Sequence, residues 1–124
     1  MNRGFKDLKV YQLSYELAME IFHFTKTFPK EEIYSLTNQI RRSSWSVCGN
    51  IAEAYRKRRY PKHFTSKITD SDGEAGETTV CLDFYLDCGY ISEENNKSLI
   101  DRYFEVGKML DSMANHPVKF LPKN

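Results

Sequence analysis

The sequence lacks the features that mark a secreted or membrane-spanning protein. Residues 1–8 contain no apolar core of the kind that a signal peptide needs, and no run approaches the roughly 18 apolar residues of a membrane span. The three cysteines, Cys48, Cys81 and Cys88, are an odd number without close pairing, so they indicate a reduced compartment rather than a disulfide framework. We therefore expect a cytoplasmic protein with no membrane segment.

The sequence also lacks the motifs of common enzymes and metal sites. It has no phosphate-cradling glycine loop and no serine or cysteine triad arrangement. Glu20 and His23 form a single Glu-x-x-His motif, whereas a di-iron site in a helical bundle needs a second such motif and further glutamates. Asp70–Glu74 resembles part of a calcium loop, but Ile68 and Thr79 fall where oxygen ligands are required. We expect no catalytic residue, no metal and no cofactor.

The chain has enough length for one core, and its charge is unevenly placed. Its 124 residues fit a single domain, 1–124, that needs no disulfide or metal. The net charge of +1 conceals a polarised molecule. Residues 41–67 hold eight Lys or Arg and one acid, a net of +7, while the remainder holds ten Lys or Arg and sixteen acids, a net of −6. No repeat, linker or low-complexity segment is present.

Apolar periodicity predicts an all-α protein. Pro29 ends the first periodic segment, Pro61 opens the third, Gly89 is a helix stop, and Ser92 is a helix cap. Because the connections are short, sequential helices should be antiparallel, which gives an up-down-up-down four-helix bundle. The expected helices are residues 8–27, 31–57, 61–88 and 93–115.

The third helix contains a polar middle. Gly73 and Gly76 each cost about 1 kcal/mol relative to alanine in a helix interior, and Asp70–Gly73 would also suit a turn. Heptad spacing nevertheless continues from Phe64 to Tyr85. This continuity favours one uninterrupted helix.

The second helix carries apolar residues on two faces. One seam faces a helix partner and runs from Ile33 to Ala54, with Ser43 and Asn50 as polar interruptions. A second stripe follows the same spacing on an offset face, which exceeds what one seam of a bundle requires. It is therefore the candidate oligomer interface, and its members are Trp45, Cys48, Ala52 and Tyr55.

Polar residues lie beside the seam of the second helix. Gln39, Ser46 and Glu53 are seven residues apart and share one strip, next to Asn50. A catalytic carboxylate with an amide orienter is one interpretation, but no nucleophile or second base supports it. We favour a structural polar network that fixes helix register, made of Gln39, Ser46, Asn50, Glu53 and Glu74.

A basic cluster straddles the turn between the second and third helices. An antiparallel bundle places this turn at one end, where several positive side chains can reach a polyanion. The alternative is a solvated helix end, or one that pairs with acidic residues of a neighbour. The candidate nucleic-acid-binding residues are Arg56, Lys57, Arg58, Arg59, Lys62 and Lys67.

Several spaced motifs, in the same order, resemble one protein family. The chain is similar to the four-helix bundle proteins encoded in 23S ribosomal RNA intervening sequences. The resemblance implies a homopentamer, and kinship with the accessory protein of diversity-generating retroelements, which binds nucleic acid and a reverse transcriptase. The motifs are Phe5–Tyr11, Phe28–Pro29 with Glu32, Gln39–Arg42, Ser46–Val47, Asn50–Glu53, Ser71 with Glu74 and Glu77, and Gly89–Ile91.

These patterns predict a non-enzymatic, homo-oligomeric helical scaffold that binds RNA or DNA through its basic end. The alternative is a protein–protein interaction module without nucleic-acid binding, in which Trp45 and Tyr55 contact another protein. A third interpretation is an enzyme that uses Glu53, Glu74 or Glu77 in a pocket of the bundle.

Overall fold

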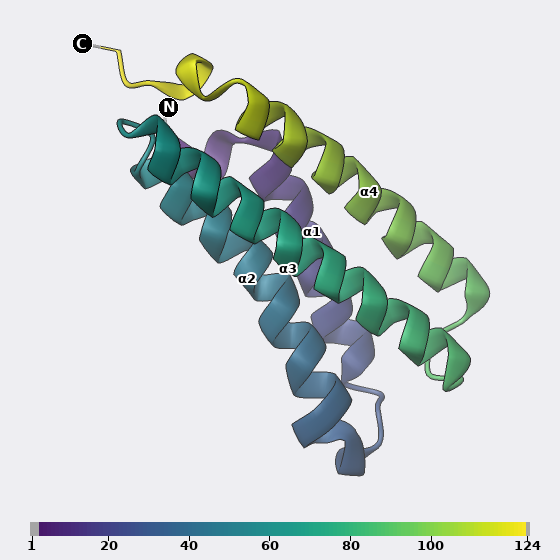
Figure 1. The fold of residues 1–124 in the computed structure, drawn as a ribbon. Coiled ribbons are helices and arrows are strands. Elements are labelled where there is room, and N and C mark those ends of the chain that lie inside the picture. The colour runs from purple at the N-terminus through teal and green to yellow at the C-terminus, as the bar shows by residue number, and fades with distance from the viewer. Residues whose placement is uncertain (1–2, 124) are drawn as a thin grey trace.

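The chain folds into four long helices. The structure, a computed structural model, describes residues 3–123, and these residues contain no strand. Figure 1 shows each long helix running antiparallel to the next, joined by short connections. The expected all-α four-helix bundle is confirmed. The helices are α1 (Lys9–Thr25), α2 (Asn38–Arg56), α3 (Pro61–Asp87) and α4 (Glu93–Asn115), with short turns η1 (Gly4–Asp7), η2 (Lys30–Glu32), η3 (Ile33–Thr37) and η4 (Pro117–Phe120).

Local sequence signals set the ends of α3 and α4. Pro61 occupies the first turn of α3, where its missing N–H costs nothing. The chain leaves α3 at Gly89, whose φ of 80° is readily adopted only by glycine. Ser92 caps α4, since its side chain accepts a hydrogen bond of 3.0 Å from the backbone N–H of Asn95. All three residues mark the helix boundaries that the sequence predicts.

Helix α3 runs without interruption through its two glycines. Gly73 and Gly76 are both exposed, on the side of the helix away from the core. The opposite face is buried along its whole length, and this burial outweighs the conformational cost of the glycines. The buried face consists of Phe64, Ile68, Ser71, Ala75, Thr78, Leu82 and Tyr85, with Cys81 beside it.

The second α-helix does not begin at residue 31, as the sequence predicts, but further along the chain. Residues 30–32 form a 3-10 turn, Ile33–Thr37 form a π-helical turn, and the α-helix begins only at Asn38. The buried Tyr85 hydroxyl donates a hydrogen bond to the carbonyl of Leu36 and ties this turn to α3. Apolar spacing alone cannot distinguish a π turn from an α turn, because both continue the apolar face.

All four helices contribute to one core. The C-terminal tail joins it at the end where α2 meets α3, since the ring of Phe120 stacks on Phe64 with centroids 5.1 Å apart. The largest fully buried apolar side chains are Leu17 and Ile21 of α1, Ile40, Val47 and Ile51 of α2, Phe64, Ile68 and Leu82 of α3, and Val106 and Leu110 of α4.

Buried hydroxyl groups join α2 to α3. Ser43 and Thr78, both fully buried, form a hydrogen bond of 2.8 Å between their hydroxyl groups. Ser71 donates from its hydroxyl to the carbonyl of Val47 at 2.7 Å. The Ser43 and Thr78 hydroxyls also hydrogen-bond to carbonyls of their own helices. Their contact across the interface, and that of Ser71, form at one longitudinal alignment only and so favour one register of the two helices.

The Tyr85 contact gives a stability prediction. Tyr85→Phe should lower the free energy of unfolding by about 1 kcal/mol, because it removes one buried hydrogen bond and preserves the ring. Chemical denaturation monitored by circular dichroism measures the change. The matched control is Tyr34→Phe, since Tyr34 is 92% exposed and should not affect stability. Equal stability of wild type and Tyr85→Phe would contradict the anchoring role.

Candidate nucleic-acid interface

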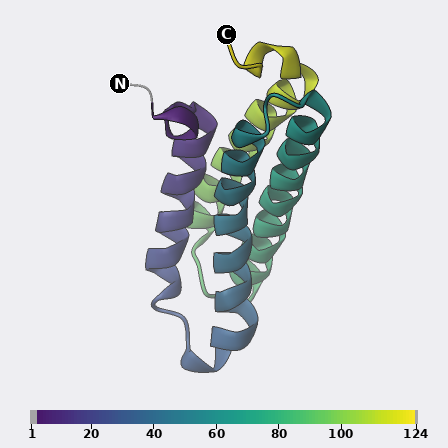
Figure 2. The ribbon, with the colours of Figure 1, turned by 90° about the vertical axis from the view of Figure 1, so that its left-hand side faces the viewer.

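The basic cluster lies at one end of the bundle. Arg56 ends α2, Lys57–Arg59 lie in the turn, and Lys62 is in the first turn of α3. Figure 2 shows η1, η4 and the α2–α3 turn at this same end, while the α1–α2 and α3–α4 connections lie at the other. The fold therefore brings segments from both ends of the described chain close to the basic cluster.

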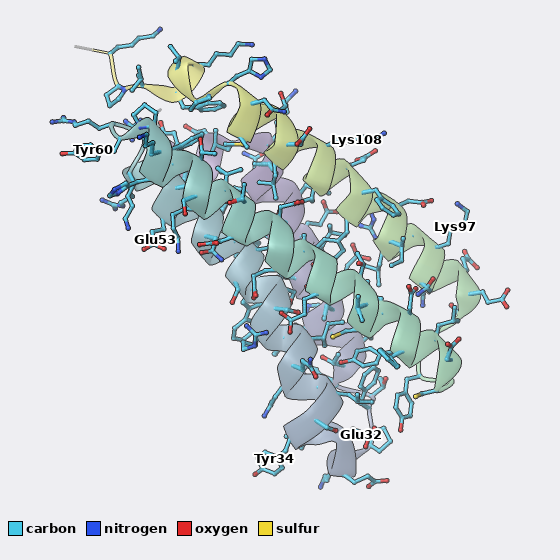
Figure 3. All side chains as sticks on the ribbon, viewed as in Figure 1. Glu32, Tyr34, Glu53, Tyr60, Lys97 and Lys108 are labelled. Carbon is cyan, nitrogen blue, oxygen red and sulfur yellow. The ribbon has the colours of Figure 1, made fainter. Side chains whose placement is uncertain are left out.

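Two members of the cluster are neutralised by a carboxylate on α2. Glu53 contacts Lys67 at 2.8 Å and Lys57 at 3.5 Å, and Lys67 also contacts Asp70 at 3.4 Å. The hydrogen bond from Lys67 lowers the pKa of Glu53, and the same contact raises the pKa of Lys67. Glu53 lies near the end that carries Tyr60 (Figure 3). Lys57 and Lys67 are thus less available to a polyanion than their sequence positions indicate.

The remaining cations stay open to solvent. Arg56, Arg59 and Lys62 are exposed and form no ion pair within residues 3–123. The guanidinium of Arg58 lies 4.1 Å from the centre of the Tyr55 ring and donates to the Tyr55 carbonyl at 3.0 Å, without a carboxylate partner in the same part of the chain. We call Arg56, Arg58, Arg59 and Lys62 the open basic surface.

A hollow of about 420 Å³ adjoins the open basic surface. It lies between η1 and the end of α2, and Arg3 adds a further cation to its lining. Arg3 is held by Asp7, which accepts hydrogen bonds from both its backbone N–H and its side chain. Sequence reasoning missed Arg3 because it is more than fifty residues from the cluster along the chain. The lining residues are Arg3, Gly4, Phe5, Tyr55, Arg56 and Arg58.

The expected polar network on α2 does not form as one unit. Asn50 donates from its side chain to the Ser46 carbonyl of its own helix at 3.0 Å, and Glu53 is occupied by the lysines. Glu74 instead binds Arg42 at 3.0 Å, and Glu77 binds the same guanidinium at 2.7 Å. Gln39 is exposed and lies beside Glu77. The structure thus joins Asn50 to Ser46, places Gln39 and Glu74 around the Arg42 pairs, and pairs Glu53 with lysines, so the five residues do not form one network.

The physical reason is the geometry of the α2–α3 contact. Gln39 and Glu53 both lie beside α3, but they meet different residues of it, Glu77 and Lys67, so the strip is divided between separate partners. The contact centres instead on Ser43 and Val47, and hydroxyl residues at the seam positions of both helices were the signal for it.

The second stripe of α2 is half covered by α1. Cys48 is buried, Ala52 and Tyr55 are half-buried, and Trp45 remains 52% exposed. Burial raises the pKa of the Cys48 thiol to about 12, so it stays protonated. Trp45 and Cys48 line a hollow of about 250 Å³ together with Tyr15 and neighbouring α1 residues. We call Tyr11, Tyr15, Met19, Phe22 and Trp45 the aromatic surface; the Phe22 and Trp45 ring centres are 6.4 Å apart.

Residues 3–123 contain no group of three or more His, Cys, Asp or Glu side chains that could hold a metal ion. Glu20 of the Glu-x-x-His motif instead forms an ion pair with Arg102 of α4, including a contact of 2.9 Å. Within residues 3–123, no helix is both long enough and apolar enough to cross a membrane.

These features define an all-α, antiparallel four-helix bundle with an open basic end and an exposed aromatic flank. The model of the 23S rRNA-intervening sequence protein family matches residues 6–112, and the chain belongs to this family. A solved structure from Bacteroides thetaiotaomicron, a protein of unknown function of the S23 ribosomal protein family, is similar at 29% identity and a TM-score of 0.77. The match covers 86% of this chain and 95% of the other. No protein with a curated description matches.

The Arg42 ion pairs predict how stability depends on pH. The hydrogen bond from Arg42 lowers the pKa of Glu77 below its unfolded value of about 4.3. This contribution is therefore present above that pH and is lost as the pH falls through the folded-state pKa. Arg42→Ala should reduce stability at neutral pH by about 1 kcal/mol or less, because the Arg42 side chain is 55% exposed.

Thermal melts of wild type and Arg42→Ala from neutral pH down to about pH 3 would test this linkage. The two curves should converge as the pH falls, because protonated Glu77 no longer forms the pair. Arg56→Ala is the control, since Arg56 has no ion pair in the described chain and its removal should leave the pH profile unchanged. A constant difference between wild type and Arg42→Ala would contradict the linkage.

Proposed function

We propose that this protein is a non-enzymatic, cytoplasmic, homo-oligomeric scaffold that binds RNA or DNA through the open basic surface. The observation that carries the proposal is the exposure of Arg56, Arg59 and Lys62 at one end without a carboxylate partner in residues 3–123. Arginine offers planar, multiple donors that match phosphate oxygens. Binding a polyanion there releases counterions, which provides much of the free energy of non-specific binding.

The glutamates that sequence reasoning considered for chemistry support a structural rather than a catalytic role. Glu53 is held by Lys57 and Lys67, while Glu74 and Glu77 are held by Arg42. These cations lower the pKa of Glu53 and Glu77. A general base near neutral pH benefits from a raised carboxylate pKa, which is the opposite shift.

The aromatic surface supports self-association. Trp45 and Tyr15 are each about half exposed, at 52% and 53%, and large aromatic side chains are common anchors of protein interfaces. The family resemblance favours five copies in a ring. A ring with an odd number of copies needs a head-to-tail interface, in which this surface meets a different surface of the next copy.

The same aromatic surface favours a second candidate function. An exposed tryptophan beside a hollow of about 250 Å³ suits a side chain from a different protein as well as from another copy. In that case the protein would be an interaction module and would not need nucleic acid. The mass of the purified protein in solution distinguishes the two functions. A homo-oligomer covers the aromatic surface with another copy, whereas a monomer leaves it free for a different protein.

The aromatic surface predicts how the protein behaves in solution. Light scattering at micromolar concentration should report a multiple of the monomer mass, with five copies favoured. Trp45→Asp should shift the protein toward monomer, because it places a charge in an apolar interface. Tyr34→Asp is the control, since Tyr34 is 92% exposed, is not part of the aromatic surface, and lies at the end of the bundle opposite the basic cluster. A monomeric wild type would reject the homo-oligomer and leave the interaction module.

Nucleic-acid binding gives a prediction with a charge-matched control. Arg56→Glu with Arg59→Glu should weaken binding to different duplex sequences almost equally, and should reduce the salt slope by about 0.9 for each phosphate that is no longer neutralised. Lys97→Glu with Lys108→Glu changes the net charge equally at exposed positions on α4, outside the basic cluster, and should have much less effect (Figure 3). Anisotropy titrations at several salt concentrations measure both.

Two results would count against nucleic-acid binding at this end. If wild-type protein binds neither RNA nor DNA at about 50 mM salt, where phosphate contacts are strong, nucleic-acid binding is not its function. Equal weakening in the two double variants would also remove the open basic surface as the site, because it would show a response to net charge alone.

A further inference from the structure

An exposed aromatic ring lies within the open basic surface. Tyr60 is 59% exposed in the turn between α2 and α3, with Arg59 before it and Lys62 two residues after it. Figure 3 shows its side chain pointing away from the end of the bundle. The ring of His63, also exposed, is centred 5.8 Å from that of Tyr60. Two aromatic rings are thus presented to solvent among cations that have no carboxylate partner in the described chain.

The backbone around Tyr60 is held firmly although its ring is exposed. The Tyr60 N–H donates to the Lys57 carbonyl at 2.9 Å, and the Tyr60 carbonyl accepts from the Phe64 N–H at the same distance. Phe64 is fully buried and stacks on Phe120, which fixes the first turn of α3. A ring on a fixed backbone loses little conformational freedom on binding, which favours affinity.

The neighbouring tyrosine is already occupied, which singles out Tyr60. Tyr55 is half-buried and is covered by the Arg58 guanidinium. Tyr34, the most exposed tyrosine in residues 3–123, lies at the opposite end beside Glu31 and Glu32. Tyr60 therefore combines an accessible ring with adjacent positive charge.

We propose that Tyr60 is a base-stacking platform and that the nucleic acid bound at this end is single-stranded. The inference rests on the proposed function. In a duplex the bases stack on one another inside the helix, so an exposed ring beside the phosphates has no base face to contact. In a single strand each base offers a face, and basic grooves with aromatic platforms bind such strands with little sequence preference. Arg59 and Lys62 then contact the flanking phosphates.

The hollow beside η1 extends the path of the strand. It shares Arg56 with the open basic surface, and its lining adds Phe5 and Arg3, the latter paired with Asp7. A strand that runs from the Tyr60 platform past Arg56 would place its next phosphates in this hollow. The path thus combines cations of α2 and of the α2–α3 turn.

The test compares strands that have the same phosphates but different bases. A labelled DNA strand of about 16 nucleotides, the same length with abasic sites, and the matching duplex are titrated by fluorescence anisotropy. Wild-type protein should bind the normal strand at least about fivefold more tightly than the abasic strand. Tyr60→Ala should remove this difference, whereas Tyr60→Phe, which keeps the ring, should retain it.

Two controls separate this inference from the proposed function. Tyr34→Ala should leave all affinities unchanged, and Tyr60→Ala should leave duplex binding unchanged. If wild type binds normal and abasic strands equally, the stacking inference is overturned while basic-end binding stands, and this result needs no variant. If wild type binds none of the nucleic acids, the proposed function itself fails. Retention of the normal-versus-abasic difference in Tyr60→Ala would overturn the assignment of stacking to this ring.

Discussion

The contact between α2 and α3 is the constraint on which the rest of the molecule depends. Fully buried hydroxyl groups of Ser43 and Thr78 meet across it, and Ser71 reaches the carbonyl of Val47. Each contact needs one longitudinal alignment of the two helices, whereas apolar packing alone tolerates several. The short turn between α2 and α3 places the basic cluster at the tip of the bundle, and the alignment decides which α3 residues lie beside each residue of α2.

The same alignment decides which cations are open to solvent. Glu53 lies one turn before the end of α2, so α3 brings Lys67 within 2.8 Å of it. That carboxylate pairs with Lys57 and Lys67, whereas Arg56, Arg59 and Lys62 stay exposed without a carboxylate partner in residues 3–123. The distribution of charge at the tip follows from helix register as well as from the number of basic residues in the sequence.

Local signals make most of the fold predictable from sequence. Apolar spacing locates the four helices, and Pro61, Gly89 and Ser92 act through their own backbone geometry, so their effects need no knowledge of distant residues. The π turn at Ile33–Thr37 is not predictable in this way, because it is tied to Tyr85 nearly fifty residues away. The ion pairs of Lys67 and the position of Arg3 beside the basic cluster likewise depend on tertiary contacts. Partners from α3 also explain why Gln39, Ser46 and Glu53 of α2 do not form the expected network.

The aromatic surface and the open basic surface occupy different parts of the bundle, and this separation matters for the proposed function. The aromatic surface lies on the flank formed by α1 and α2, whereas the basic residues lie at the tip. In a cyclic ring joined through the flanks, with the bundles parallel to the ring axis, every copy would point its tip to the same side. One tip offers few phosphate contacts, but a strand crossing several tips gains affinity through effective concentration. Assembly and nucleic-acid binding would then be linked, with the flank supplying the avidity that a single tip lacks.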